Sequence, residues 1–355
     1  MSGSPSADRS RVFHDWRQAV PFVLGISLFL ALVLSLCIGA YPVPFATVAR
    51  IFVRLAWPAP LSQHVPWSLT QQIVVQSVRL PRIVLATLAG VGLGLSGAAL
   101  QGMMRNPLVG PDIVGVTSGA AFGGVLALVL GFSPFGAVGL AFGGGMVALV
   151  LASGLARLAR GGGVLPLILS GVVVGAFFAA GVSFTLYVAD PFYKLPTIVY
   201  WLMGSFAGAT RQKVLILFFP TIGAGAVILG LRWRLNLMSL GDSDASALGL
   251  KVQRLRWLIV GLVSLIVAAQ VSVSGGVGWV GLVVPHFSRM LVGPDHRRLV
   301  PTAGALGGIF LLAVDDIARC ITVQEIPIGV LTALVGTPIF AFMLWRAQTR
   351  GWANE

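Results

Sequence analysis

The stretch IVLATLAGVGLGLSGAALQGMM, residues 83–104, holds 22 residues and no charged side chain. As an α-helix it would be about 33 Å long, which is close to the ~30 Å hydrocarbon thickness of a bilayer. Arg82 and Arg105 stand directly at its two ends. The stretch therefore predicts a transmembrane helix with one charge at each membrane surface.

Nine further apolar runs of this kind occur along the chain. They cover residues 19–40, 113–131, 137–156, 165–188, 214–231, 257–273, 277–292, 300–318 and 327–345. The first resembles a signal peptide because Arg17 precedes it, but it exceeds the 7 to 15 apolar residues of a signal core. The pattern predicts an all-α polytopic membrane protein with about ten transmembrane helices.

The composition agrees with a membrane protein. Of the 355 residues, 57% are apolar and only 10% are charged, against about 25% charged in soluble domains. The net charge of +13 comes without any basic block. Nucleic acid is therefore excluded as a partner, whereas lipid is expected around the spans.

The 45 glycines suggest close helix packing. Small residues four apart let helix backbones approach each other in lipid. Such pairs stand at Gly90/Gly94, Gly119/Gly123, Gly139/Gly143 and Gly171/Gly175. We expect these four pairs to lie at helix contacts in a compact bundle.

The Lys and Arg of the connecting segments set the orientation. With the N-terminus inside, sixteen lie inside and eight outside, which favours cytoplasmic termini. This predicts cytoplasmic tails at 1–18 and 346–355 around a single domain at 19–345. The outside segments 42–82 and 189–213 are expected to hold short surface helices.

The longest inside connection, 232–256, has the composition of a helix, a turn and a second helix. Asp242 or Ser243 can cap a short helix, and Gly249 can end it.

Several kinds of chemistry are missing from the sequence. No Gly-x-x-x-x-Gly-Lys-Ser/Thr loop occurs, so ATP binding by this chain is not expected. The four histidines are scattered and no catalytic or metal-ligand spacing is present. Cys37 and Cys320 are expected to be free thiols, although a disulfide between them stays open.

A secondary, ion-coupled transporter is the rival class of function. It requires ionisable groups within the spans. Acids embedded in an apolar run are Asp315 and Asp316, and Arg319 follows Asp315 by four residues. A local ion pair at a helix end explains these residues without ion coupling.

A series of motifs from residue 79 onward identifies a family. They are RLPR (79–82), SGAALQ (96–101), RNPL (105–108), GVTSGA (115–120), WLMGS (201–205), LG (240–241), ALG (247–249), GWVGLVVPH (278–286), DHR (295–297), EIPIG (325–329) and GTP (336–338). In this order they resemble the permease subunit of bacterial type II ABC importers for iron-siderophores, haem and vitamin B12.

The resemblance implies a homodimer in the bacterial inner membrane. It also implies two ATP-binding subunits on the cytoplasmic side and a periplasmic substrate-binding protein. ATP and Mg²⁺ would be used by the ATPase partner, and this chain would be no enzyme and bind no cofactor or metal.

The resemblance also implies roles for individual residues. Arg79, Arg82 and Arg319 would receive acidic residues of the binding protein, although the segment from Arg319 to Glu325 is one residue shorter than the family pattern. Residues that would contact the ATPase are Leu240, Gly241, Asp242, Ala245, Leu248 and Gly249. Residues that would line the pathway, or else pack in the core, are Phe177, Phe178, Phe184 and Phe340.

The substrate expected from the sequence is haem. This rests on the stretch WLMGSFAGAT at 201–210, which resembles haem permeases more than vitamin B12 permeases. A ferric siderophore or vitamin B12 are the alternatives.

Overall fold

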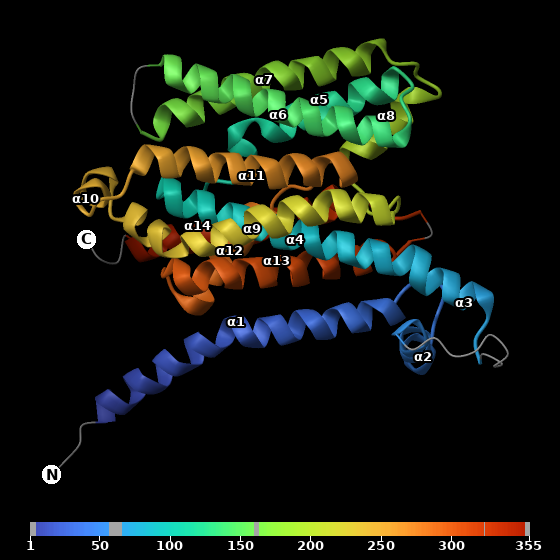
Figure 1. Ribbon diagram of the computed structural model, residues 1–355, viewed down its shortest axis with the longest axis horizontal. Helices are drawn as coiled ribbons and strands as arrows, with labels where there is room; N and C mark the ends of the chain where they lie inside the picture. The colour runs from blue at the N-terminus through green and yellow to red at the C-terminus, as the bar shows by residue number, and fades with distance from the viewer. Residues whose placement is uncertain (1–4, 57–65, 160–162, 323, 352–355) are drawn as a thin grey trace.

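The computed structural model describes residues 5–56, 66–159, 163–322 and 324–351, and their regular structure is helical throughout. Most of the helices run side by side along one axis (Figure 1). Helices α5, α6, α7 and α8 form one outer layer, the middle of the bundle holds α4, α9 and α11, and α1 lies on the opposite side against α13. The helices are α1 (Pro5–Cys37), α2 (Phe45–Ala56), α3 (Leu69–Ile73), η1 (Val74–Arg79), α4 (Leu80–Met104), η2 (Pro111–Val114), α5 (Val116–Val129), α6 (Pro134–Leu158), α7 (Leu165–Val188), α8 (Lys194–Leu202), α9 (Arg211–Ser239), α10 (Asp242–Ala247), α11 (Val252–Ser274), α12 (Val280–Val292), α13 (His296–Ala318) and α14 (Ile328–Gly351).

The ten predicted spans are all present as apolar helices in the described part of the chain. Seven are long and apolar enough to cross a membrane, while α5, α12 and α14 have shorter apolar stretches. The start of α1, the end of α14 and α10 lie at one end of the bundle, and α2, α3 and α8 lie at the other (Figure 1). We call these the inner and the outer end. The terminal segments are more helical than expected, because α1 begins at Pro5 and α14 continues to Gly351.

Helix α4, which contains the opening stretch, is the centre of the bundle. In its apolar window 83% of the residues are buried, against 11% in α1. A Cβ atom added at Gly90 or Gly94 would lie 2.1 Å from the Gly307 or Ala303 carbonyl oxygen of α13. At Gly97 it would lie 1.8 Å from the carbonyl oxygen of Gly281 in α12. The absence of side chains thus permits α4 to contact two helices through their backbones.

Of the three other predicted glycine pairs, two lie at contacts with neighbouring backbone and one faces open space. Gly119 and Gly123 face the backbone of α6, and Gly171 lies against the carbonyl oxygen of Ile113. Gly139 and Gly143 meet nothing within 4 Å, so the expectation of a helix contact is wrong for that pair within this chain.

The predicted span at residues 83–104 lies in α4, and the helix extends further upstream than the apolar run. The helix runs without a break from Leu69 to Met104. A proline inside a helix removes one hydrogen bond and crowds the preceding turn. The structure accommodates Pro81 after one π-helical turn, η1, in which Leu80 N–H donates to the Val75 carbonyl.

The short surface helices were predicted correctly. Helices α2 and α3 lie in the segment 42–82, α8 lies in 189–213, and α10 lies in the inner connection. The predicted N-cap of α10, Asp242 or Ser243, is wrong. Gly241 is the N-cap residue, with φ +122°, and no side chain caps the helix. Gly249, with φ +82°, follows its end as expected. Cys37 and Cys320 are free thiols.

Candidate functional site

At the outer end, Arg82 is enclosed by two acidic residues. Its Nε and Nη2 donate to the Asp315 carboxylate at 3.0 and 2.8 Å, and its Nη1 donates to Glu325 Oε1 at 2.7 Å. Arg82 is 5% exposed and Asp315 is fully buried. A guanidinium fork matches a carboxylate in this bidentate geometry, so the pair joins α4 firmly to α13.

Arg319 and Arg79 are also held by groups of this chain. Arg319 forms an ion pair with Asp316 and donates to the backbone and side-chain oxygens of Ser35 in α1 at 2.8 and 2.7 Å. Arg79 donates to the carbonyl oxygen of Leu36 at 2.7 Å and to that of Tyr41. The two arginines therefore fasten the end of α1 to α4 and α13.

The three arginines predicted to bind a partner are thus buried and internally paired. Arg79, Arg82 and Arg319 are 4%, 5% and 8% exposed. Their docking role stays a prediction. The expected ion pair between Asp315 and Arg319 is present but long, at 3.9 Å. The main partner of Asp315 is Arg82, at 2.8 Å.

At the inner end, α10 presents two apolar side chains to the surface. Leu240 precedes α10 and is 57% exposed, and Leu248 follows it and is 61% exposed. Ala245 is fully buried and seats α10 on the bundle. Asp242 pairs with Arg256 Nη2 at 2.8 Å, which fixes α10 to α11. Of the six predicted ATPase contacts, the two leucines are therefore the protruding side chains.

A polar cluster lies beside this end, where α9 meets α13. Asn236 Nδ2 donates to Asp295 Oδ1 at 2.6 Å, and the backbone N–H of His296 donates to Asn236 Oδ1 at 2.8 Å. Burial tends to raise the pKa of Asp295, but the hydrogen bonds from Asn236 and the Arg297 backbone lower it overall. Asp295 also accepts the backbone N–H of Arg297 and thereby caps α13.

The four phenylalanines predicted to line the pathway do not converge within this chain. Phe177 and Phe184 are exposed on one face of α7, whereas Phe178 is buried against Phe122. Phe340 of α14 packs edge-on against Trp279, with ring centres 6.1 Å apart. The structure therefore places Phe178 in the core, and Phe177 and Phe184 on an outward face.

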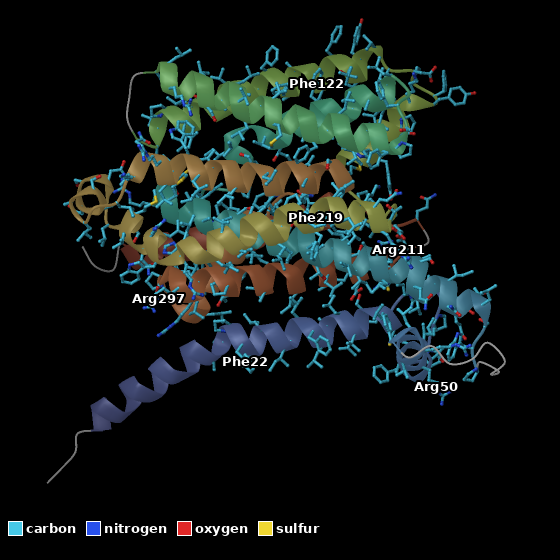
Figure 2. All side chains as sticks on the ribbon, in the orientation of Figure 1. Phe22, Arg50, Phe122, Arg211, Phe219 and Arg297 are labelled. Atoms are coloured by element: carbon cyan, nitrogen blue, oxygen red, sulfur yellow. The ribbon has the colours of Figure 1, made fainter. Side chains whose placement is uncertain are left out.

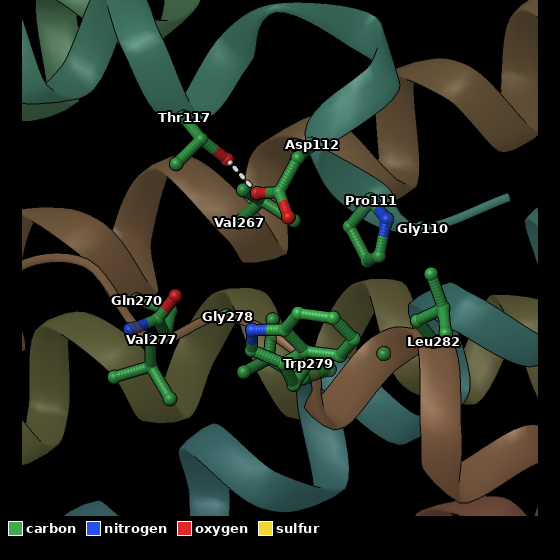
Figure 3. Close-up of a pocket in the computed structure, with 12 residues that line it drawn as sticks. Gly110, Pro111, Asp112, Thr117, Val267, Gln270, Val277, Gly278, Trp279 and Leu282 are labelled. Carbon is green, nitrogen blue, oxygen red and sulfur yellow. Dashed lines mark hydrogen bonds between the residues drawn. The ribbon is translucent and has the colours of Figure 1, made fainter. Parts of the chain in front are cut away.

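A pocket that the sequence did not predict lies between η2, α5, α11 and the start of α12. The pocket has a volume of about 240 Å³ and is lined by Asp112, Thr117, Gln270 and Trp279, among others (Figure 3). Thr117 Oγ1 donates to Asp112 Oδ1 at 2.7 Å. Trp279 also borders a larger, open apolar pocket of about 810 Å³ beside α14. Asp112 precedes an apolar run, and nothing in its local sequence indicates that a pocket forms around it.

Residues in the stretch 201–210, from which haem was expected, form backbone hydrogen bonds with two other parts of the chain. Ser205 N–H donates to the Ser274 carbonyl at 2.8 Å, and Ile328 N–H donates to the Gly204 carbonyl at 2.9 Å. Phe206 is fully buried. These residues join α8, α11 and α14.

The model of the FecCD transport family matches residues 27–346 of this chain. The chain belongs to the FecCD transport family. It is therefore a polytopic permease of the ABC importer family, a class found in the inner membrane of bacteria. Members of the family are transport subunits that work with ATPase and binding-protein partners.

Individual relatives align with this FecCD family member over nearly its whole length. The molybdate import system permease protein of Haemophilus influenzae is 44% identical over 94% of this chain and 97% of its own length. The Fe(3+) dicitrate transport system permease protein of Escherichia coli is 36% identical over 94% and 95%. A solved metal-chelate type ABC transporter in an inward-facing conformation is 42% identical, with a TM-score of 0.82 over 93% of this chain and 99% of that one.

Proposed function

We propose that this chain is one of two identical permease subunits of an ATP-driven importer. A periplasmic binding protein would deliver the substrate to the outer end, and two ATPase subunits at the inner end would drive its release into the cytoplasm. ATP and Mg²⁺ would be bound by the ATPase subunits. The observation that carries this proposal is the pair of exposed leucines around α10, in a chain of the FecCD family that has no phosphate-binding loop.

The outward faces of α7 and α14 support a second copy of the chain as a partner. Phe177, Phe184 and Leu334 are about two-thirds exposed on these faces. The open pocket beside α14 is mainly apolar and includes Trp279 and Leu334. A pathway between two copies would be lined by these mainly apolar surfaces, which offer a substrate no tight polar binding site. Specificity would then reside in the binding protein.

For the substrate, we propose a metal oxyanion such as molybdate. The support is the 44% identity to a molybdate permease over nearly the whole of both chains. Iron chelates are the second candidate, supported by the dicitrate permease. Haem, expected from residues 201–210, belongs to this second group, and its supporting stretch has the structural role described above.

A reconstituted complex distinguishes these substrates. The permease, its ATPase and its binding protein are placed in liposomes, and the binding protein is loaded in turn with molybdate, haem, a ferric siderophore or cobalamin. We expect molybdate to give the largest stimulation of ATP hydrolysis and to accumulate in the lumen. Stimulation by haem or a siderophore without any by molybdate would contradict the oxyanion proposal and leave the importer proposal intact.

The ATPase contact can be tested at Leu248. Leu248→Glu, with Leu240→Glu, places two carboxylates where apolar side chains would be buried against the ATPase, and burying an unpaired charge is strongly unfavourable. We expect the ATPase to be lost on co-purification while the permease remains folded. Leu158→Glu is the matched control, because Leu158 is 79% exposed at the inner end of α6. Equal retention of the ATPase by all variants would contradict the assignment.

A further inference from the structure

An open pocket lies at the inner end of the bundle, where the last turns of α9 meet the first turns of α11. Figure 1 shows α10 at this end, beside the ends of α9 and α11. The pocket has a volume of about 430 Å³. Its walls combine three cationic side chains with apolar ones, namely Arg234, Lys251 and Arg254 with Leu250, Leu255 and Leu258.

The three cations of this pocket are not neutralised by the chain. Arg234, Lys251 and Arg254 are exposed, and no carboxylate of the described residues forms an ion pair with any of them. Arg256, only two residues further on, is buried and paired with Asp242 at 2.8 Å. Because three like charges line one hollow, an anion bound there would relieve their mutual repulsion.

The apolar wall of the pocket continues along α11 into the membrane-spanning part of the helix. Leu258 follows Arg254 by one turn and is 44% exposed. Gly261 follows Leu258 on the same face, and a Cβ atom added there would meet nothing within 4 Å. An apolar chain can therefore leave the cationic part of the pocket and lie against this face of α11.

Two tryptophans indicate the depth of the pocket in the membrane. Trp233 directly precedes Arg234 in α9, and Trp257 lies in the second turn of α11. Each ring contacts a guanidinium group, with Arg297 5.5 Å from the Trp233 ring centre and Arg157 5.2 Å from that of Trp257. Tryptophan and arginine together are typical of the headgroup level of a bilayer. The cations of the pocket thus lie at the level of lipid phosphates.

We propose that this pocket binds an anionic phospholipid of the cytoplasmic leaflet. The lipid phosphate contacts Arg234, Lys251 and Arg254, and one acyl chain lies against Leu258. Basic pockets between membrane helices on the cytoplasmic side suit such headgroups. The positive-inside orientation places the pocket on that side. Since Leu248 also lines the pocket, the bound lipid borders the proposed ATPase contact without being part of it.

The test is native mass spectrometry of the full chain in detergent, with phosphatidylglycerol and phosphatidylcholine added in equal amounts. Each cation near an anionic headgroup should favour binding about fivefold. Arg234→Gln with Arg254→Gln is therefore expected to lower the preference for phosphatidylglycerol about 25-fold. Thermal unfolding verifies that each variant is folded.

The matched control removes two other exposed cations from the same end. Arg232→Gln with Arg297→Gln leaves the pocket unchanged, because neither residue lines it. Figure 2 shows Arg297 on the far side of α9 from α11. We expect this variant to keep the preference of the wild type. Arg234→Lys with Arg254→Lys should also keep most of it, since lysine binds phosphate as a point charge.

Three results would overturn the inference. The first is an equal preference for phosphatidylglycerol in the wild type and the Arg234/Arg254 glutamine variant, or an equal loss in the control. The second is inorganic phosphate raising the unfolding temperature as much as phosphatidylglycerol does, which would assign the pocket to a soluble anion. The third is loss of ATPase assembly by the glutamine variant with its lipid preference intact, which would assign the pocket to the ATPase. Because the lipid measurement contains no ATPase, failure of the importer proposal would not alter its result.

Discussion

Asp315→Ala is expected to destabilise the folded permease by about 3 to 5 kcal/mol, because removing one partner of a buried ion pair leaves the other charge uncompensated. Asp315 is fully buried and accepts three hydrogen bonds from Arg82. Glu325 would still neutralise one side of the guanidinium but is itself partly exposed. The measurement is thermal unfolding of the purified protein in detergent, followed by tryptophan fluorescence.

The control for this prediction removes both charges. Arg82→Leu with Asp315→Leu leaves no unpaired ion at the contact between α4 and α13, and apolar replacement of a buried pair is often tolerated. We therefore expect the double variant to unfold at a higher temperature than Asp315→Ala. An Asp315→Ala protein as stable as the wild type would show that the pair does not hold the outer end together.

Gly97→Ala is expected to be similarly damaging, by about 3 kcal/mol or more. The added methyl group would overlap the backbone of Gly281 in α12, and backbone atoms cannot move aside as a flexible side chain can. Size-exclusion profiles of detergent extracts would measure the fraction of folded protein at several temperatures.

Gly143→Ala supplies the matched control. It is the same change in the middle of α6, at a position with open space around it. There the alanine should be neutral or slightly stabilising, because glycine is a poor helix former. Equal losses at both positions would contradict the close approach of α4 to α12.

The helices were largely predictable because the bilayer requires long apolar runs, and these are local in sequence. The stretch 83–104 and its nine counterparts became ten helices. Other features depend on contacts that the local sequence does not show. The sequence does not reveal the π-helical turn η1, which precedes Pro81 in the continuous helix. Gly139 and Gly143 have the spacing of a packing pair, but spacing cannot say whether a helix face meets a partner or open space.

The site was less predictable because its contacts join distant parts of the chain. Arg82 and Glu325 are 243 residues apart, and only the fold brings them together. The sequence singled out Arg79, Arg82 and Arg319 at the outer end, but it could not show that all three are buried, because burial follows from packing. The leucines beside α10 were named because the segment resembles the family's ATPase-contacting segment, and their exposure is seen only in the structure.

The central claim is that this chain transports only as part of an ATP-driven complex. The direct measurement compares substrate uptake by liposomes that hold the purified chain alone with uptake by liposomes that also hold its ATPase, both supplied with the loaded binding protein. The account predicts uptake only with the ATPase, with ATP and Mg²⁺ on the ATPase side, and none from a proton or sodium gradient. Uptake by the chain alone under an ion gradient would contradict it and favour a secondary transporter.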